Sequence, residues 1–186
     1  MTYIYVLGRY LFMPMHETEL SVDLYLPSGS DSRIEVYLRS LAPTAGNKRQ
    51  MDWLDRLRRL EAVGALDTVT AHVWGDSIST QTPEISGLDD VLGRITDIYS
   101  FSAENEPSIT PFFRVTRIDA SLSGESFERI VPPPCTFMCY ESDTLVGVFP
   151  CQIDERTYGP ADVIERLESD LGTELVESVN RESSTN

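Results

Sequence analysis

The chain has 186 residues, 41% of them hydrophobic, which suits one domain with its own core and is short for two domains. Its 30 acidic and 15 basic residues give a net charge of −15. Because apolar residues recur with regular spacing through most of the chain, this charge indicates the surface of a folded protein and excludes a disordered acidic chain.

The composition also indicates the compartment. Lys48 is the only lysine, and an acidic, arginine-rich, lysine-poor chain is typical of a high-salt cytoplasm; an ordinary acidic protein is the alternative. Three cysteines are an odd number in a chain too long to need disulfide bonds, which favours a reducing interior. Residues 1–13 are apolar but shorter than the roughly 20 residues of a membrane span. We therefore expect a cytoplasmic protein that does not enter a membrane.

The chain divides into three predicted segments. Residues 1–31 form a leader in which the alternation of Val22–Leu26 is compatible with an extra strand. Residues 32–171 form a single α/β domain, and residues 172–186 form an acidic, partly mobile tail. The leader also contains two alternatives to Met1 as the start, Met13 and Met15.

The domain begins with the pattern of a βαβ unit. Residues 32–39 alternate between apolar and polar, which predicts a half-buried strand. An amphipathic helix is expected at about 48–63, with Asn47 as its N-cap and Gly64 just past its end. Residues 68–74 alternate again. Because a crossover helix joins the two strands, we expect them to be parallel.

The later elements complete the expected fold. We predict a helix at about 86–103, strands at 109–118 and 127–131, a hairpin of 135–140 with 145–149, and a last helix that ends near Leu171. A further short strand around Ile78 is compatible with the pattern. The fold class is α/β, of the two-layer α+β type, with a mixed sheet of about five strands and helices mainly on one face. The predicted element order is βαβαβββα.

The register of the hairpin decides whether two of the cysteines meet. With the three-residue loop Ser142–Thr144, Cys139 opposes Gly147 and Cys135 opposes Cys151, close enough for a disulfide or a shared metal. With a two-residue loop, every partner shifts by one and Cys151 turns to the other face. We prefer the two-residue loop, which keeps the thiols apart and inert, and a redox-sensing pair is the alternative.

The first helix contains five of the fifteen basic residues, Lys48, Arg49, Arg56, Arg58 and Arg59. Four of them are candidate nucleic-acid-binding residues, namely Lys48, Arg49, Arg56 and Arg59. The alternative is a self-paired, solvated helix face. Asp52 precedes Arg56 by four residues and Asp55 precedes Arg59 by four, a spacing that favours ion pairs within the helix.

No pattern in the sequence indicates catalysis, a metal or a cofactor. The spacings of Cys135, Cys139 and Cys151 are poor for a zinc site with His72, and cysteines in strands usually behave as small buried hydrophobes. A nucleophile elbow, a phosphate-binding glycine loop and a His-Glu-x-x-His helix are all absent from the sequence. We therefore expect a protein that is not an enzyme.

Several pieces of the sequence occur together in a known family: Val36–Pro43, Arg56–Leu60, His72–Gly75, Pro111–Phe113 and Val148–Cys151. In these pieces the chain resembles, over roughly residues 32–171, small haloarchaeal proteins catalogued as helix-turn-helix domain-containing. The resemblance implies a DNA-binding or transcription-regulatory protein, with DNA as its partner, but assigns no site. The pattern of the chain itself equally fits a non-enzymatic module that binds a small ligand or another protein, including a second copy in a homodimer.

Overall fold

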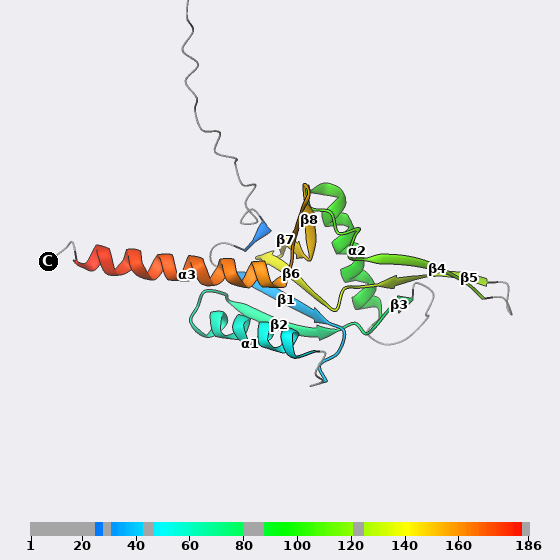
Figure 1. Cartoon of the computed structure of the whole chain (residues 1–186), viewed down its shortest axis with the longest axis horizontal. Coiled ribbons are helices and arrows are strands. Elements are labelled where there is room, and N and C mark those ends of the chain that lie inside the picture. Colours follow the sequence, from blue (N-terminus) through cyan, green and yellow to red (C-terminus); the bar gives the residue numbers. More distant parts are fainter. Residues whose placement is uncertain (1–24, 28–30, 43–46, 80–87, 121–124, 184–186) are drawn as a thin grey trace, which may run out of the picture.

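The computed structural model describes residues 25–27, 31–42, 47–79, 88–120 and 125–183, and has an α+β fold built around a mixed sheet (Figure 1). The predicted fold class is thus confirmed. Within these residues the helices are α1 (Lys48–Ala62), α2 (Leu88–Glu104) and α3 (Pro160–Ser183). The strands are β1 (Ser32–Leu38), β2 (Thr68–Val73), β3 (Ile78–Ser79), β4 (Arg114–Ala120), β5 (Glu125–Val131), β6 (Cys135–Glu141), β7 (Thr144–Phe149), β8 (Cys151–Ile153) and β9 (Arg156–Tyr158).

The strands are divided among separate sheets. The main sheet has the order β2-β1-β6-β7, in which β1 is parallel to β2, as the βαβ pattern predicts, and antiparallel to β6. A second sheet has the order β3-β5-β4, and β8 pairs with β9. The strand series between α2 and α3 is therefore longer than predicted. The prolines at 132–134, which have no N–H to donate, separate β5 of the second sheet from β6 of the main sheet.

Two helices cover one face of the main sheet, which we call the apolar face. Leu54, Leu57 and Leu60 of α1 pack there against β1 and β6, together with Val163 and Ile164 of α3. The leucine spacing of three residues places these side chains on one stripe of the helix, as predicted from the periodicity. Burying each such side chain contributes about 1.5–3 kcal/mol.

The opposite face of the main sheet, which we call the α2 face, is also covered. Ile95, Ile98 and Phe101 of α2 pack there with Ile78 and Ile130 of the second sheet. Helices therefore cover both faces, and the arrangement has more layers than the two predicted. As a result β1 is buried on both faces, which corrects the expectation of a half-buried strand.

The two ends of α1 differ in how well the sequence predicts them. Gly64 has a φ of 80°, and the amides of Gly64 and Ala65 donate to the carbonyls of Glu61 and Leu60, which is the Schellman arrangement expected after a helix. Asn47 makes no side-chain capping hydrogen bond. Asn47 occupies the predicted N-cap position, but the expected hydrogen bond to the first turn is not made, and its amide group donates to two backbone carbonyls of the preceding loop.

The β6–β7 hairpin combines the two registers considered from the sequence. Glu141 pairs with Thr144, which leaves the predicted two-residue loop between them. A β-bulge then shifts the register between Cys139 and Tyr140, and Cys139 pairs with Gly147 as a three-residue loop would predict. The preferred two-residue register is therefore wrong beyond the bulge. The three thiols are nevertheless free and buried.

The predicted leader and tail can be compared with the two ends of the described chain. The extra strand considered at Val22–Leu26 lies mostly outside the described residues. Leu26 itself is buried in the apolar-face core. At the other end, α3 continues to Ser183, so most of the segment predicted as a tail after residue 171 is helical.

Candidate functional site

A buried carboxylate lies on the α2 face of the main sheet. Glu35 belongs to β1, between β2 and β6, and the residue is only 4% exposed. Strand alternation directs it away from the apolar face, to which Ile34 and Val36 belong. A carboxylate removed from water needs opposite charge and hydrogen bonds, since an unpaired buried charge is strongly destabilising.

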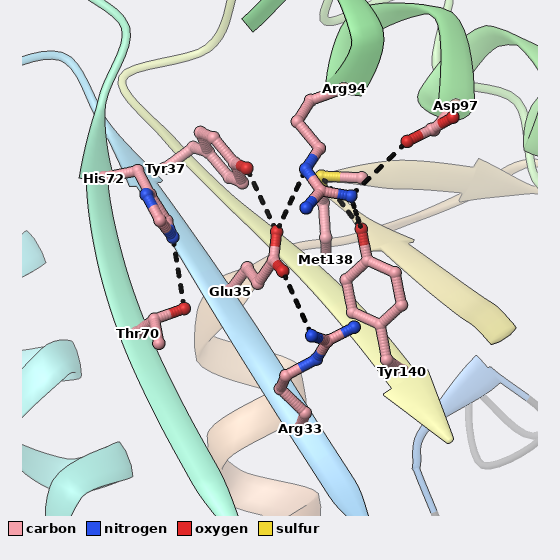
Figure 2. A network of polar contacts seen from close by, with 9 residues as sticks. All are labelled: Arg33, Glu35, Tyr37, Thr70, His72, Arg94, Asp97, Met138 and Tyr140. Atoms are coloured by element: carbon pink, nitrogen blue, oxygen red, sulfur yellow. Dashed lines mark hydrogen bonds and ion pairs between the residues drawn. The ribbon is translucent and has the colours of Figure 1, made fainter. Parts of the chain in front are cut away.

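Three side chains supply these contacts (Figure 2). The Tyr37 hydroxyl donates a hydrogen bond of 3.0 Å to Glu35 Oε2. Nε of Arg94, on α2, lies 3.5 Å from the same oxygen, and Nη1 of Arg33 lies 3.7 Å from Oε1. The carboxylate therefore connects β1 to α2 through charge as well as through packing.

Arg94 extends the network to Tyr140 on β6. Its Nη1 donates to the Tyr140 hydroxyl at 3.3 Å and lies 3.5 Å from Oδ2 of Asp97. The guanidinium of Arg33 lies 4.4 Å from the centre of the Tyr140 ring, within the range of a cation–π interaction. Both arginines that compensate the Glu35 charge thus also contact Tyr140.

Burial raises the pKa of both phenols of the network, so they stay protonated well above neutral pH. It raises the pKa of Tyr140 to about 12, and the nearby Glu35 carboxylate adds to the rise. The pKa of Tyr37 is also raised, first by burial and then by Glu35. Because a protonated phenol remains a donor, Tyr37 continues to stabilise the carboxylate across the physiological range.

Aromatic rings flank the network on the side of β2. The Tyr37 ring stacks on His72, with ring centres 4.9 Å apart and an angle of 21° between the planes, and lies 5.0 Å from the Trp74 ring. The cysteines belong instead to the core of the apolar face. His72 is therefore separated from them by the sheet, so these residues do not form the zinc site considered from the sequence.

An open pocket of about 330 Å³ adjoins the network at Arg94 and Tyr140. Carboxylates of Asp97, Glu104 and Asp143 line it together with the apolar side chains of Phe101 and Leu145. The excess of carboxylates favours a small polar or cationic molecule over an anion. Among the described residues, no group of three or more acidic, histidine or cysteine side chains is placed to bind a metal ion.

The four candidate residues of α1 are not brought together as one positive surface. Nζ of Lys48 lies 3.1 Å from Asp52, and the Arg56 guanidinium makes two hydrogen bonds, of 2.9 and 2.6 Å, to Glu168 of α3. The expected pairing of Asp52 with Arg56 is wrong because each has another partner. The hydrogen bonds from Arg56 lower the pKa of the Glu168 carboxyl.

The other two candidates, Arg49 and Arg59, are exposed. The guanidinium of Arg49 lies 5.9 Å from the centre of the Trp53 ring. By helical spacing, Arg59 shares the outer face of α1 with Asp52 and Asp55. Positive and negative charges therefore alternate along this face.

The cysteines have the properties of core residues. Burial raises the pKa of Cys135 and of Cys151 to about 12 and also raises the pKa of Cys139. A thiol is a nucleophile or a metal ligand only as the thiolate. At neutral pH these three groups are therefore unreactive packing groups.

A family model described as a helix-turn-helix domain matches residues 27–172, which include most of the described elements. The chain belongs to this family. No curated protein and no solved structure matches it. No helix in the described part of the chain is long and apolar enough to cross a membrane.

The described elements of this helix-turn-helix family member do not include two helices joined by a tight turn. α1 is followed by β2 and α2 by β4, which is the alternation predicted from the sequence. Any contact with DNA through the described residues must therefore use a surface other than a standard recognition helix.

The network around Glu35 is not evident from the sequence. Arg33, Glu35 and Tyr37 alternate with the core residues of β1, which is also the pattern of a solvent-facing side. One feature of the sequence could have indicated that Glu35 is buried: residues 135–140, which form β6, are apolar on both faces. A strand paired beside such a strand is expected to be covered on both faces as well.

Proposed function

We propose that the protein is a DNA-binding regulator of transcription that acts without catalysis. Membership of the helix-turn-helix family carries this proposal, because the match spans residues 27–172 and thus the α/β body as a whole. The acidic, lysine-poor composition adds a high-salt cytoplasm as its setting.

Such a setting restricts how an acidic protein holds DNA. At about 1 M salt the Debye length is only ~3 Å, so long-range attraction to phosphates is lost. Each phosphate contact also makes the affinity fall more steeply as salt rises. Binding then depends on closely fitted contacts from arginines that have no other partner. Of the α1 candidates, Lys48 and Arg56 have ion-pair partners, which leaves Arg49 and Arg59.

The test is a titration of the full-length protein against labelled duplex DNA from the region that precedes its own gene, with a scrambled duplex as control. Fluorescence anisotropy is measured from about 0.1 to 3 M KCl. We expect saturable binding that is tighter for the native duplex and weakens as salt rises. Absence of binding to either duplex at every salt concentration would contradict the proposal.

A second candidate is a non-enzymatic module that binds a small ligand or forms a homodimer. The pocket beside Arg94 and Tyr140 favours it, since a ligand there would contact α2 and the β6–β7 hairpin together. Thermal unfolding with a panel of organic amines tests the ligand, with Asp97→Asn as the matched variant. Light scattering tests the dimer. A stabilisation by an amine that is lost in Asp97→Asn, combined with no DNA binding, would favour this candidate.

A further inference from the structure

The β4–β5 ribbon extends away from the body of the molecule, on the side opposite to the C-terminal end of α3 (Figure 1). Its two strands pair antiparallel along their whole length, and β3 joins β5 only at Ile130 and Arg129. Ile130 is buried in the α2-face core and anchors the base of the ribbon. Beyond this anchor, residues 114–117, 128 and 129 of the ribbon are exposed.

One side of this ribbon carries two arginines. The register places Arg114 opposite Val131 and Arg129 opposite Thr116, in consecutive pairs on the same side. Both arginines are exposed, and neither has a hydrogen bond or ion pair to any side chain that the structure describes. We call this side, with Arg114, Thr116 and Arg129, the arginine face.

The other side of the ribbon has its charge balanced internally. Arg117 donates a hydrogen bond of 2.8 Å to Oγ of Ser126 and lies opposite Glu128 in the strand register. Val115 on this side is 52% exposed. The two sides therefore differ in the charge they can offer a partner.

The location of the arginine face matters in so acidic a chain. Residues 114–131 contain three arginines and three acidic residues and are therefore neutral, whereas the chain carries −15. An anionic partner is repelled by most of the surface and approaches where repulsion is weakest and free cations are present. A two-stranded antiparallel ribbon also fits the major groove of duplex DNA, which is about 12 Å wide.

We propose that the arginine face of the β4–β5 ribbon is the main surface by which the protein contacts the phosphates of duplex DNA. This inference rests on the DNA-binding function proposed above. It assigns the contact to Arg114 and Arg129 rather than to α1. On α1, Lys48 and Arg56 are engaged in ion pairs, and the remaining candidates lie on a helix that also presents Asp52 and Asp55.

The test compares two double variants that remove the same charge. Arg114→Gln/Arg129→Gln alters the arginine face, and Arg49→Gln/Arg59→Gln alters α1. We expect the ribbon variant to bind the duplex about tenfold more weakly or worse, and the slope of log affinity against log salt to fall by about two. The α1 variant should keep nearly the native affinity and slope. Equal melting temperatures show that both variants are folded.

The outcomes separate this inference from the function on which it rests. If the native protein binds no duplex, the DNA-binding function is wrong and the ribbon assignment falls with it. If the native protein binds and the ribbon variant binds equally well, or the α1 variant loses as much, only the ribbon assignment is wrong.

A cross-linking experiment tests the same surface without removing any charge. The native thiols are buried, so a single introduced cysteine can be labelled selectively with a photo-cross-linker. Thr116→Cys places the label on the arginine face, and Val115→Cys places it on the opposite side of the same strand. We expect cross-links to DNA from position 116 and few from position 115. Equal or reversed yields would overturn the assignment.

Discussion

The two faces of the main sheet are stabilised in different ways. The apolar face meets α1 and α3 through aliphatic and aromatic side chains and thiols, with Leu57 and Phe137 fully buried. The α2 face also has a hydrophobic core, but it includes the Glu35 carboxylate between two guanidinium groups. One strand, β1, contributes Val36 to the first face and Glu35 to the second.

The two faces should therefore tolerate different changes of residue and of pH. Removal of apolar area from water is insensitive to the charge state of nearby groups, so packing dominates on the apolar face. A buried charge network is favourable only while every member keeps its partner. Near neutral pH we therefore expect the apolar face to respond mainly to changes of volume and the α2 face to changes of charge.

The largest effect is expected on the apolar face. Leu57→Ala removes a side chain with 0% exposure and leaves a cavity under α1, which should lower the free energy of unfolding by about 2–5 kcal/mol. Val63→Ala, at a residue that is 63% exposed, is the control and should change it by less than about 0.5 kcal/mol. Urea unfolding measures both. Similar small losses in the two variants would show that α1 does not depend on this contact.

A smaller loss is expected when the α2 face loses its charge. Glu35→Gln keeps the shape but removes the carboxylate that Arg33 and Arg94 share, which should cost about 1–3 kcal/mol. Glu155→Gln, an exposed site, serves as the control. Urea unfolding at neutral pH is the measurement. A variant as stable as the native protein would mean that the network contributes no net stability.

Alkaline pH should destabilise both faces, because burial raises the pKa of a titratable group on each. The Tyr140 phenol has a pKa of about 12 in the folded chain against an ordinary value of about 10. Between these values the unfolded chain has released the proton that the folded chain still holds, so stability falls as pH rises, by up to about 1.4 kcal/mol per pH unit for one group. Tyr140→Phe should flatten this fall between about pH 10 and 12.

The matched variant for this titration is on the other face. Cys135→Ala removes a thiol whose pKa is likewise raised by burial, and it should flatten the fall from about pH 9 upward. Stability is followed by urea unfolding at a series of pH values. If Tyr140→Phe leaves the profile unchanged between about pH 10 and 12, the phenol does not differ in protonation between the two states.

The smallest effect concerns an ion pair at the edge of the apolar face. Arg56 and Glu168 make a two-hydrogen-bond contact between α1 and α3, but their side chains are 28% and 42% exposed. A double-mutant cycle with Arg56→Ala and Glu168→Ala should give a coupling of about 0.2–1 kcal/mol that decreases in high salt. A coupling above about 2 kcal/mol would place this pair among the principal contacts of the face.

The features predicted best from the sequence are those that depend only on residues close together in the chain. The stripe of Leu54, Leu57 and Leu60 and the glycine after the helix need only neighbouring residues, so α1 and its end at Gly64 were predicted correctly. The parallel pairing of β1 with β2 follows from the same short segment. The family also follows from pieces of sequence that occur in the right order.

The candidate site was missed because distant segments create it. Glu35 is buried only because α2, which carries Arg94 from much later in the chain, covers that side of β1. The partner of Arg56 could not be foreseen either, since Glu168 lies 112 residues away. The hairpin register failed for a related reason. The two-residue loop determines the strand pairs next to the turn, and packing in the core determines the pairs further along. The β-bulge between Cys139 and Tyr140 shifts the register from one to the other.

The placement of α1 and α3 on one face has a consequence for synthesis of the chain. The leucines of α1 are synthesised well before the residues of β6 and α3 that cover them. Loop closure over so long a segment is slow compared with helix formation, so the apolar stripe of α1 is exposed while translation continues. We therefore expect this face to assemble only after α3 has been synthesised, and incomplete products that end before α3 to aggregate through it.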